Sequence, residues 1–260
     1  MGTADETIIA VVNDDGPASP GLRALLEEVG RLGKVLAVVP ERGEGGRGKS
    51  ITLFKPIRAM EMGESFYVVS GTPADAFLIA LELLRPERPD LLVSGINMGP
   101  NIGLEDLFHS GTLGAAIQAV LHGIPAIAIS YAIGEGLPRP SEGQMAIDLK
   151  TAGQIAVRLA SAVLTYGMPE GVDMISVNVP VGADIHRIAI TEPLKKPFWS
   201  ASRAEESFFI TPWPKKRPSG PVGSDVWAIL NGYVSITPIS LSLEHDISSL
   251  RSFLERAKML

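Results

Sequence analysis

Short apolar runs alternate with segments of helical periodicity through the first half of the chain. The runs are predicted to be strands, because nearly continuous apolar stretches are typical of strands that are buried on both faces of a parallel sheet. They cover residues 7–12, 35–39, 51–54, 66–69, 91–93 and 125–130. Strands that alternate with helices predict an α/β fold, in which right-handed crossovers join the strands of a parallel sheet.

Three helices are predicted between these strands, and the start of each carries a local signal. Ser19-Pro20 places a capping serine before a proline at the first helical position. The sequence TPAD at 72–75 resembles a capping box, and its helix is expected to continue to Leu84. Ser110 precedes a third helix, which is expected over 111–121.

The second half of the chain is less regular. Residues 192–222 combine proline, aromatic and basic residues without a clear period, so they form either an extended arm or an ordered lid. The predicted elements are a helix over about 145–165, strands at 174–179 and 187–191, and strand-like alternation within 226–237. The predicted domains are a catalytic core over 1–185 and an extension over 186–260, with an irregular arm or hairpin at 192–237 and a C-terminal amphipathic helix at 246–258.

Composition narrows the class of protein. With 260 residues, of which 45% are hydrophobic, the chain can bury a large core. No apolar run approaches the roughly 20 residues of a membrane span, and the N-terminus lacks the pattern of a signal peptide. The net charge of −6 argues against a general nucleic-acid binder, and the absence of cysteine excludes disulfides. We therefore expect a cytoplasmic protein with no membrane and no specific nucleic-acid partner.

Polar residues follow the predicted strands at positions that suit a ligand site, since open parallel sheets bind ligands beyond the carboxyl ends of their strands. Asn13-Asp14-Asp15-Gly16 follows the first strand, and Gly95-Ile96-Asn97 follows the strand at 91–93. Two adjacent carboxylates favour a hard cation such as Mg²⁺ or Mn²⁺, and Asn97 can add an amide oxygen. The alternative reading is that Asp-Gly only forms a turn.

A candidate anion site lies at Ser110-Gly111-Thr112. Free N–H groups at a helix N-terminus bind anions, and the two hydroxyls can add donors to phosphate oxygens. Ordinary N-capping by Ser110 is the alternative. The four histidines are too scattered for a zinc signature, and His109 beside Ser110 is the one candidate acid catalyst among them.

Residues 43–50 fit the P-loop pattern G-x-x-x-x-G-K-S letter for letter. A P-loop needs a helix directly after it, so that the helix N-terminus faces the phosphates. Here residues 51–56 are strand-like and end in proline. A basic, glycine-rich active-site loop is therefore favoured, and a P-loop nucleoside triphosphatase stays as an alternative.

Taken together, several motifs resemble the SurE family of survival proteins. They are NDDG at 13–16 followed by SPGLRAL, GTPAD at 71–75, SGINMGPN at 94–101, SGTLGAA at 110–116, NVP at 178–180 and GYVSITP at 232–238. The resemblance runs from about residue 7 to 240. It implies a Rossmann-like three-layer sandwich with a mostly parallel sheet. It also implies a small C-terminal extension used in oligomerisation, and a homodimer or homotetramer with exchanged C-terminal segments.

The resemblance further implies a phosphatase that depends on one divalent metal cation, Mg²⁺ or Mn²⁺. Its substrates would be nucleoside 5′- and 3′-monophosphates, and short polyphosphate in addition. The implied metal ligands are Asp14, Asp15 and Asn97. The family also has a serine ligand in the loop after the second strand, and this position is Gly45 here, which has no side-chain oxygen. Either water or a loop carbonyl replaces the serine, or Ser50 or a shifted register of the loop supplies the ligand.

The resulting site assignment has two parts. The expected catalytic residues are Asp14, Asp15, Asn97 and Ser110, and the expected phosphate-binding residues are Asn13, Gly95, Ser110, Gly111 and Thr112. The nucleophile is either a metal-activated water or Asp14 itself. Because Gly45 replaces the serine, a nucleotide-binding module without turnover is a further alternative.

Overall fold

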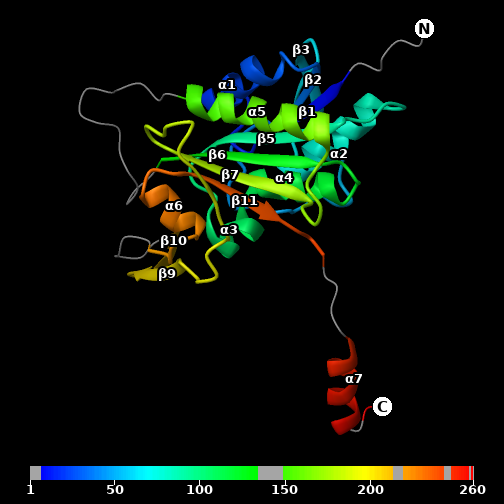
Figure 1. Ribbon diagram of the computed structural model, residues 1–260. Coiled ribbons are helices and arrows are strands. Elements are labelled where there is room, and N and C mark those ends of the chain that lie inside the picture. Colours follow the sequence, from blue (N-terminus) through cyan, green and yellow to red (C-terminus); the bar gives the residue numbers. More distant parts are fainter. Residues whose placement is uncertain (1–6, 134–148, 213–218, 243–246, 258, 260) are drawn as a thin grey trace.

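A nine-stranded sheet forms the centre of the molecule in the computed structural model, which describes residues 7–133, 149–212, 219–242, 247–257 and 259 (Figure 1). Its strands are β1 Ile8–Val12, β2 Lys34–Pro40, β3 Ala59–Gly63, β4 Phe66–Val69, β5 Leu91–Met98, β6 Ala126–Ala132, β7 Met174–Pro180, β8 Ile188–Ile190 and β11 Val234–Ile239. Their order is β3-β4-β2-β1-β5-β6-β7-β11-β8. All neighbours from β4 to β7 are parallel, whereas β3 and β11 run antiparallel to β4 and β7. The predicted α/β fold with a mostly parallel sheet is confirmed.

Helices cover both faces of this sheet, which gives the three layers that were expected (Figure 1). Helices α1 (Pro20–Val29) and α5 (Lys150–Tyr166) lie on one face, and α2 (Pro73–Leu84) and α4 (Gly111–Val120) lie on the other. Strand β1 is buried throughout and sends alternate side chains into two apolar clusters, as its period of two requires. The first strand is therefore central, and its carboxyl end is enclosed from both sides.

The local signals for helix starts are confirmed. The Ser19 hydroxyl accepts a hydrogen bond from the N–H of Leu22 at the start of α1. Thr72 and Asp75 form the reciprocal capping box of α2. Ser110 caps α4 by accepting from the N–H of Leu113.

One strand prediction was wrong, and another was confirmed only in part. Residues 51–54 form no strand, because the start of α2 holds this segment: the Thr52 N–H donates to Asp75, and the Thr72 hydroxyl donates to the Ser50 carbonyl. The edge strand is instead β3, whose five residues are all exposed. Residues 226–230 belong to helix α6 (Asp225–Leu230), which Ser224 caps, and only 234–237 of the expected strand lies in β11. A short helix, α3 (Gly103–His109), was not predicted.

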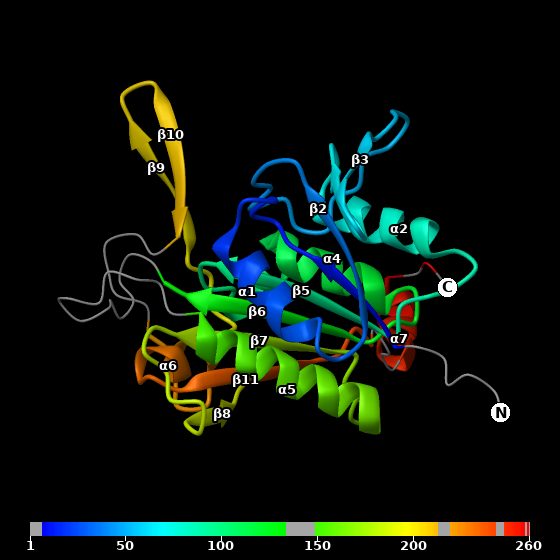
Figure 2. The ribbon, with the colours of Figure 1, turned by 90° about the horizontal axis from the view of Figure 1, so that it is seen from above.

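The sheet continues past residue 185, because β8 and β11 complete it. Within the expected arm, β9 (Trp199–Ala204) and β10 (Ser207–Pro212) form a separate antiparallel hairpin that projects from the body (Figure 2). Helix α7 (Ile247–Arg256) stands away from the sheet and buries none of its residues (Figure 1). Residues 145–148, 246 and 258, at the ends of two predicted helices, lie outside the described residues. None of the described helices is long and apolar enough to cross a membrane.

Candidate active site

The carboxyl ends of β1 and β5 bring the predicted acidic pair and Asn97 to one edge of the sheet. The two strands pair in parallel with Val12 opposite Ser94, so that the residues following Val12 lie beside those following Ser94. The N–H of Met98 donates to Asp15 Oδ2 at 2.9 Å, which joins the two strand ends directly. The neighbourhood expected from the sequence is therefore present.

Asp14 is buried against the start of α4, with 4% of its surface exposed. The Thr112 hydroxyl donates to Asp14 Oδ1 at 2.5 Å. A Cβ atom on Gly111 would lie only 2.8 Å from the Asp14 Cβ, so the helix can begin at this place only with glycine. Burial raises the pKa of Asp14 to about 6; the hydrogen bond from Thr112 opposes this shift, and the charge of Asp15 adds to it.

Asp15 and Asn97 are less deeply buried than Asp14. Burial raises the pKa of Asp15 as well, and the hydrogen bond from Met98 opposes the shift. Asn97 donates its side-chain NH₂ to the Gly99 carbonyl at 2.8 Å, which fixes the orientation of the amide and keeps its oxygen as an acceptor. The register of β5 against β6 shifts between Ser94 and Asn97, and such irregularities commonly redirect side chains beside active sites.

Asn13 and Gly95 support the loops around the acidic pair. The Asn13 NH₂ donates to the Gly16 carbonyl at 2.8 Å, and its oxygen accepts from the Gly16 N–H at 3.3 Å, so the side chain closes the turn that holds Asp14 and Asp15. Gly95 is buried within β5, where a Cβ would lie 2.2 Å from the Ile129 carbonyl oxygen. Both residues were predicted to bind phosphate, and the contacts described for them are structural.

Ser110 and Thr112 use their hydroxyls differently. Ser110 accepts from the Leu113 N–H at 3.2 Å, and this capping bond leaves the hydroxyl proton for another acceptor. Thr112 commits its hydroxyl proton to Asp14. The backbone N–H of Thr112 also favours the ionised form of Asp14, so the first turn of α4 faces the acidic pair.

The glycine-rich segment 43–50 lies over this helix start. The Glu44 N–H donates to the Asp14 carbonyl at 2.8 Å, and the Gly48 N–H donates to the His109 carbonyl at 2.7 Å. A Cβ on Gly114 would lie 2.2 Å from the Gly48 carbonyl oxygen, so the loop packs closely on α4. Residues 51–53 have no regular structure, so the helix that a P-loop requires is missing and the P-loop alternative is rejected.

Two residues of this loop bear on ligand binding. Glu44 is buried and pairs with Arg42 at 3.1 Å and Arg47 at 2.9 Å, both exposed, which holds the loop in shape. No atom lies within 4 Å of a Cβ built on Gly45. A side chain at position 45 would therefore enter open space close to the acidic pair.

Asn178 is a site-supporting residue to which sequence reasoning assigned no role. The Asn101 N–H donates to Asn178 Oδ1 and the Asn178 NH₂ donates to the Asn101 carbonyl, both at 2.8 Å. Asn101 also donates to the Ser130 hydroxyl at 2.8 Å. The loop after Asn97 is thereby fixed to β6 and β7. The rule that polar residues at the carboxyl ends of strands form the site would have found Asn178, which lies near the end of β7.

The donor set at this edge fits a divalent cation. It consists of two carboxylates and one amide oxygen, which are hard ligands of the kind that Mg²⁺ and Mn²⁺ prefer. The described part of the chain contains no group of three or more histidine, cysteine, aspartate and glutamate residues placed to hold a metal. A cation bound by Asp14 and Asp15 would take its other ligands from groups such as the Asn97 amide oxygen, water or substrate.

Comparisons with known proteins agree with this geometry. A family model described as survival protein SurE matches residues 9–199. The chain belongs to the SurE family. The 5′-nucleotidase SurE of Thermofilum pendens is 38% identical to it, over 96% of this chain and 97% of the relative. The 5′-nucleotidase SurE of Methanothrix thermoacetophila is 36% identical, over 95% of this chain and 98% of the relative.

The SurE fold is also found in a solved structure. The crystal structure of the SurE protein from Aquifex aeolicus aligns with a TM-score of 0.79 and 33% sequence identity, covering 95% of this chain and 99% of that one. The resemblance drawn from the motifs is thus confirmed for the family and for the fold.

Proposed function

We propose that this protein is a divalent-metal-dependent 5′-nucleotidase, which hydrolyses nucleoside 5′-monophosphates to nucleoside and phosphate. The observation that carries the proposal is the contact of the buried Asp14, next to the half-buried Asp15, with the glycine start of α4. Relatives over nearly the whole length that bear the name 5′-nucleotidase SurE support it. Nucleoside 3′-monophosphates and short polyphosphate are included as further substrates.

Asp14, Asp15 and Asn97 would hold one Mg²⁺ or Mn²⁺ ion. When bound, the cation neutralises the carboxylate pair and stabilises the negative charge of the phosphoryl group. The Thr112 hydroxyl would keep the Asp14 carboxylate in its orientation, and the Met98 N–H would do the same for Asp15. Both interactions favour the ionised, ligand-binding form of the acids.

The start of α4 would bind the substrate phosphate. The Ser110 hydroxyl would donate to one phosphate oxygen and the Gly111 N–H to another, where the helix dipole favours negative charge. Donors fixed in this way stabilise the charge that develops in the transition state.

We propose water as the nucleophile in preference to Asp14. The Asp14 carboxylate is 4% exposed and already bound by Thr112 at one oxygen, so it is poorly placed to attack phosphorus. Rapid acid quench during turnover, with ³²P-labelled substrate, is expected to trap no labelled protein. Labelled protein that is absent from Asp14→Asn would instead support an acyl phosphate on Asp14.

We also propose that the protein is a homodimer or homotetramer built through its C-terminal extension. Helix α7 exposes the apolar residues Ile247, Leu250 and Phe253 at helical spacing, and such a face normally packs against another element. Light scattering on the full chain is expected to give a mass of two or four subunits. The double variant Leu250→Asp/Phe253→Asp is expected to lower it, and an unchanged mass would contradict the role of α7.

The function is tested by phosphate release from AMP, GMP, CMP and UMP in EDTA, Mg²⁺ and Mn²⁺. The proposal predicts release only with metal, and little release from ATP. Undiminished release in EDTA would contradict the metal site. Binding of AMP without release under any metal would support the alternative of a module without turnover.

A further inference from the structure

A small cavity lies next to the start of α4, on the side of α3. Its volume is about 290 Å³, it is open to solvent, and it is lined by Leu104, Glu105, Phe108 and His109 of α3 and by residues 195–197 opposite them. His109 directly precedes Ser110, and its carbonyl oxygen accepts from the Gly48 N–H of the glycine-rich loop. The cavity therefore begins one residue away from the proposed phosphate site.

Apolar and aromatic groups make up most of the surface of this cavity. Leu104 and Phe108 lie one helical turn apart, and they are 39% and 64% exposed. Pro197 lines the opposite side. Small-molecule pockets typically measure about 300–1,000 Å³. The cavity is at the lower end of this range, so it suits one planar ring system better than a whole nucleotide.

Residues 195–197 are held in place from both ends, so the cavity is preformed. The Leu194 N–H donates to Asp225 Oδ1 at 3.0 Å. The N–H groups of Phe198 and Trp199 both donate to Glu105 Oε2, at 2.5 and 3.1 Å. A preformed wall lowers the entropic cost of binding, because the segment need not become ordered around a ligand.

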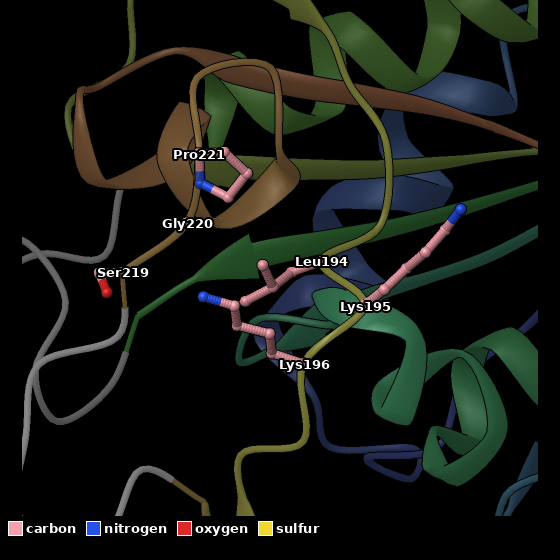
Figure 3. Close-up of a pocket in the computed structure, with 6 residues that line it drawn as sticks. All are labelled: Leu194, Lys195, Lys196, Ser219, Gly220 and Pro221. Atoms are coloured by element: carbon pink, nitrogen blue, oxygen red, sulfur yellow. The ribbon is translucent and has the colours of Figure 1, made fainter.

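Charged groups of both signs line the cavity: the Glu105 carboxylate on α3, which accepts from the N–H groups of Phe198 and Trp199, and two lysines opposite it. The lysines are Lys195 and Lys196, and neither forms an ion pair with another residue in the described part of the chain. Both also line a larger cavity of about 500 Å³ beyond the segment, and Figure 3 shows the two side chains extending to opposite sides, with Lys196 toward Ser219. Ammonium groups beside an aromatic wall suit a ligand that has both a π-face and hydrogen-bond acceptors.

We infer that the cavity between α3 and residues 195–197 binds the nucleobase of the substrate, with Phe108 stacking on the base. The inference rests on the proposed function, which places the phosphate at the start of α4. A base has the planar shape, the π-face and the carbonyl or ring-nitrogen acceptors that this cavity fits. Stacking depends little on sequence, because every base has a π-face. The enzyme is therefore expected to accept all four common bases.

The test compares AMP with ribose 5-phosphate, which has the same sugar and phosphate but no base. In Phe108→Ala the ratio of kcat/KM for AMP to that for ribose 5-phosphate should fall about tenfold, through a higher KM for AMP. Phe108→Trp should restore the ratio. The control is Tyr166→Ala, which removes an aromatic side chain that is 85% exposed at the far end of α5 and should leave the ratio unchanged.

Two results would overturn the base assignment: an unchanged ratio in Phe108→Ala, or an equal loss for both substrates. If AMP binding resists Phe108→Ala but weakens in Lys196→Gln, the cavity binds a phosphate and the assignment is also wrong. If the wild type hydrolyses neither compound, the proposed function is wrong. Calorimetric measurement of AMP binding then tests separately whether the cavity binds the base. In that case, AMP must bind the wild type more tightly than Phe108→Ala does; equal affinities would exclude the base pocket.

Discussion

Two pairs of aspartates in this molecule differ in what surrounds their oxygens. Asp14 and Asp15 lie at the edge of the sheet, whereas Asp106 and Asp225 lie beneath the β9–β10 hairpin, where they join α3, α6 and residues 194–199. Burial raises the pKa of all four carboxyls, and those of Asp14 and Asp106 reach about 6. A raised pKa therefore does not distinguish the two pairs.

Hydrogen-bond donors do distinguish them. Asp106 accepts from the Ile102 N–H and the Trp199 indole, one at each oxygen and both at 3.0 Å. Asp225 accepts from three backbone N–H groups, with both of its oxygens engaged. Asp14 accepts from the Thr112 hydroxyl at Oδ1 and also interacts with the Thr112 N–H, whereas Asp15 accepts from the Met98 N–H at Oδ2 and also interacts with the Ser19 hydroxyl. Asp106 and Asp225 form a structural clamp between distant segments, whereas Asp14 and Asp15 are held by donors at the starts of α4 and α1 and at the end of β5.

The largest expected effect is on catalysis at the sheet edge. Asp14→Asn should lower kcat/KM for AMP by more than about a hundredfold, because even groups that only orient a metal ligand contribute about 10–100-fold. Steady-state phosphate release at saturating Mn²⁺ measures this. Activity within fivefold of the wild type would remove Asp14 from the site.

The same substitution should make the metal-free protein more stable. At pH 7 the wild type keeps a buried, ionised Asp14 beside Asp15, and asparagine removes that charge while its oxygen still accepts from Thr112. The free energy of unfolding in EDTA should rise by about 1–3 kcal/mol, as a shift of about two pKa units implies. Urea unfolding checks this. A loss of stability in Asp14→Asn would show that the ionised Asp14 does not destabilise the metal-free protein.

Asp225→Asn should have the opposite effects, namely lower stability and nearly unchanged catalysis. The side-chain NH₂ would face backbone N–H groups, so the free energy of unfolding should fall by about 1–3 kcal/mol. The kcat of the folded fraction should stay within about threefold of the wild type, since ordinary mutations away from the chemistry act through stability. A hundredfold loss of kcat in fully folded Asp225→Asn would show that both aspartate pairs take part in catalysis.

The pH dependence follows from the sign of the shift at Asp14. Its pKa is about 6 in the folded protein and 3.8 ordinarily, so the folded state holds a proton that the unfolded state releases. The stability of the metal-free protein therefore falls as the pH rises from about 4 to 6, and is level above that. Because asparagine has no such proton, the stability advantage of Asp14→Asn should grow over this window and then remain constant. Unfolding at several pH values checks it, and an advantage independent of pH would contradict the shift.

The smallest expected effect is a gain at Gly45. Gly45→Ser adds a hydroxyl in open space, so the free energy of unfolding should change by less than about 0.5 kcal/mol. If the hydroxyl reaches the cation, Mn²⁺ affinity should rise about three- to tenfold, because the site gains one neutral oxygen ligand. Calorimetric titration measures this, with Gly43→Ser as the matched control, because a Cβ at Gly43 also meets no atom.

Local sequence signals predicted the elements that they determine by themselves. Ser19, Thr72 and Ser110 cap their helices through neighbours three residues away, so each signal was complete within a short window. Helix α3 was missed because its first turn has no side-chain cap and depends on Asp225, 122 residues distant from Gly103. Strand β3 has only the short alternation Met60-Glu61-Met62 and is fully exposed, so its pairing with β4 is what defines it.

Some features of the candidate site could likewise be predicted from the sequence, and others could not. The position of Asp14, Asp15 and Asn97 at one edge follows from the rule for strand ends, and the structure brings them together. Two hydrogen bonds, from Asn13 to Gly16 and from the Thr112 hydroxyl to Asp14, depend on side-chain geometry. The spacing of residues in the sequence does not determine that geometry. The residues 195–197 that form the cavity lie far from α3 in sequence, so no motif indicated them.

The most direct test of the contrast between the two pairs is a calorimetric Mn²⁺ titration of the wild type, Asp15→Asn and Asp225→Asn at pH 7. We predict one site per subunit in the wild type, a loss of affinity of more than about tenfold in Asp15→Asn, and wild-type affinity in Asp225→Asn. Equal Mn²⁺ affinity in the wild type and Asp15→Asn, or a loss confined to Asp225→Asn, would contradict the account.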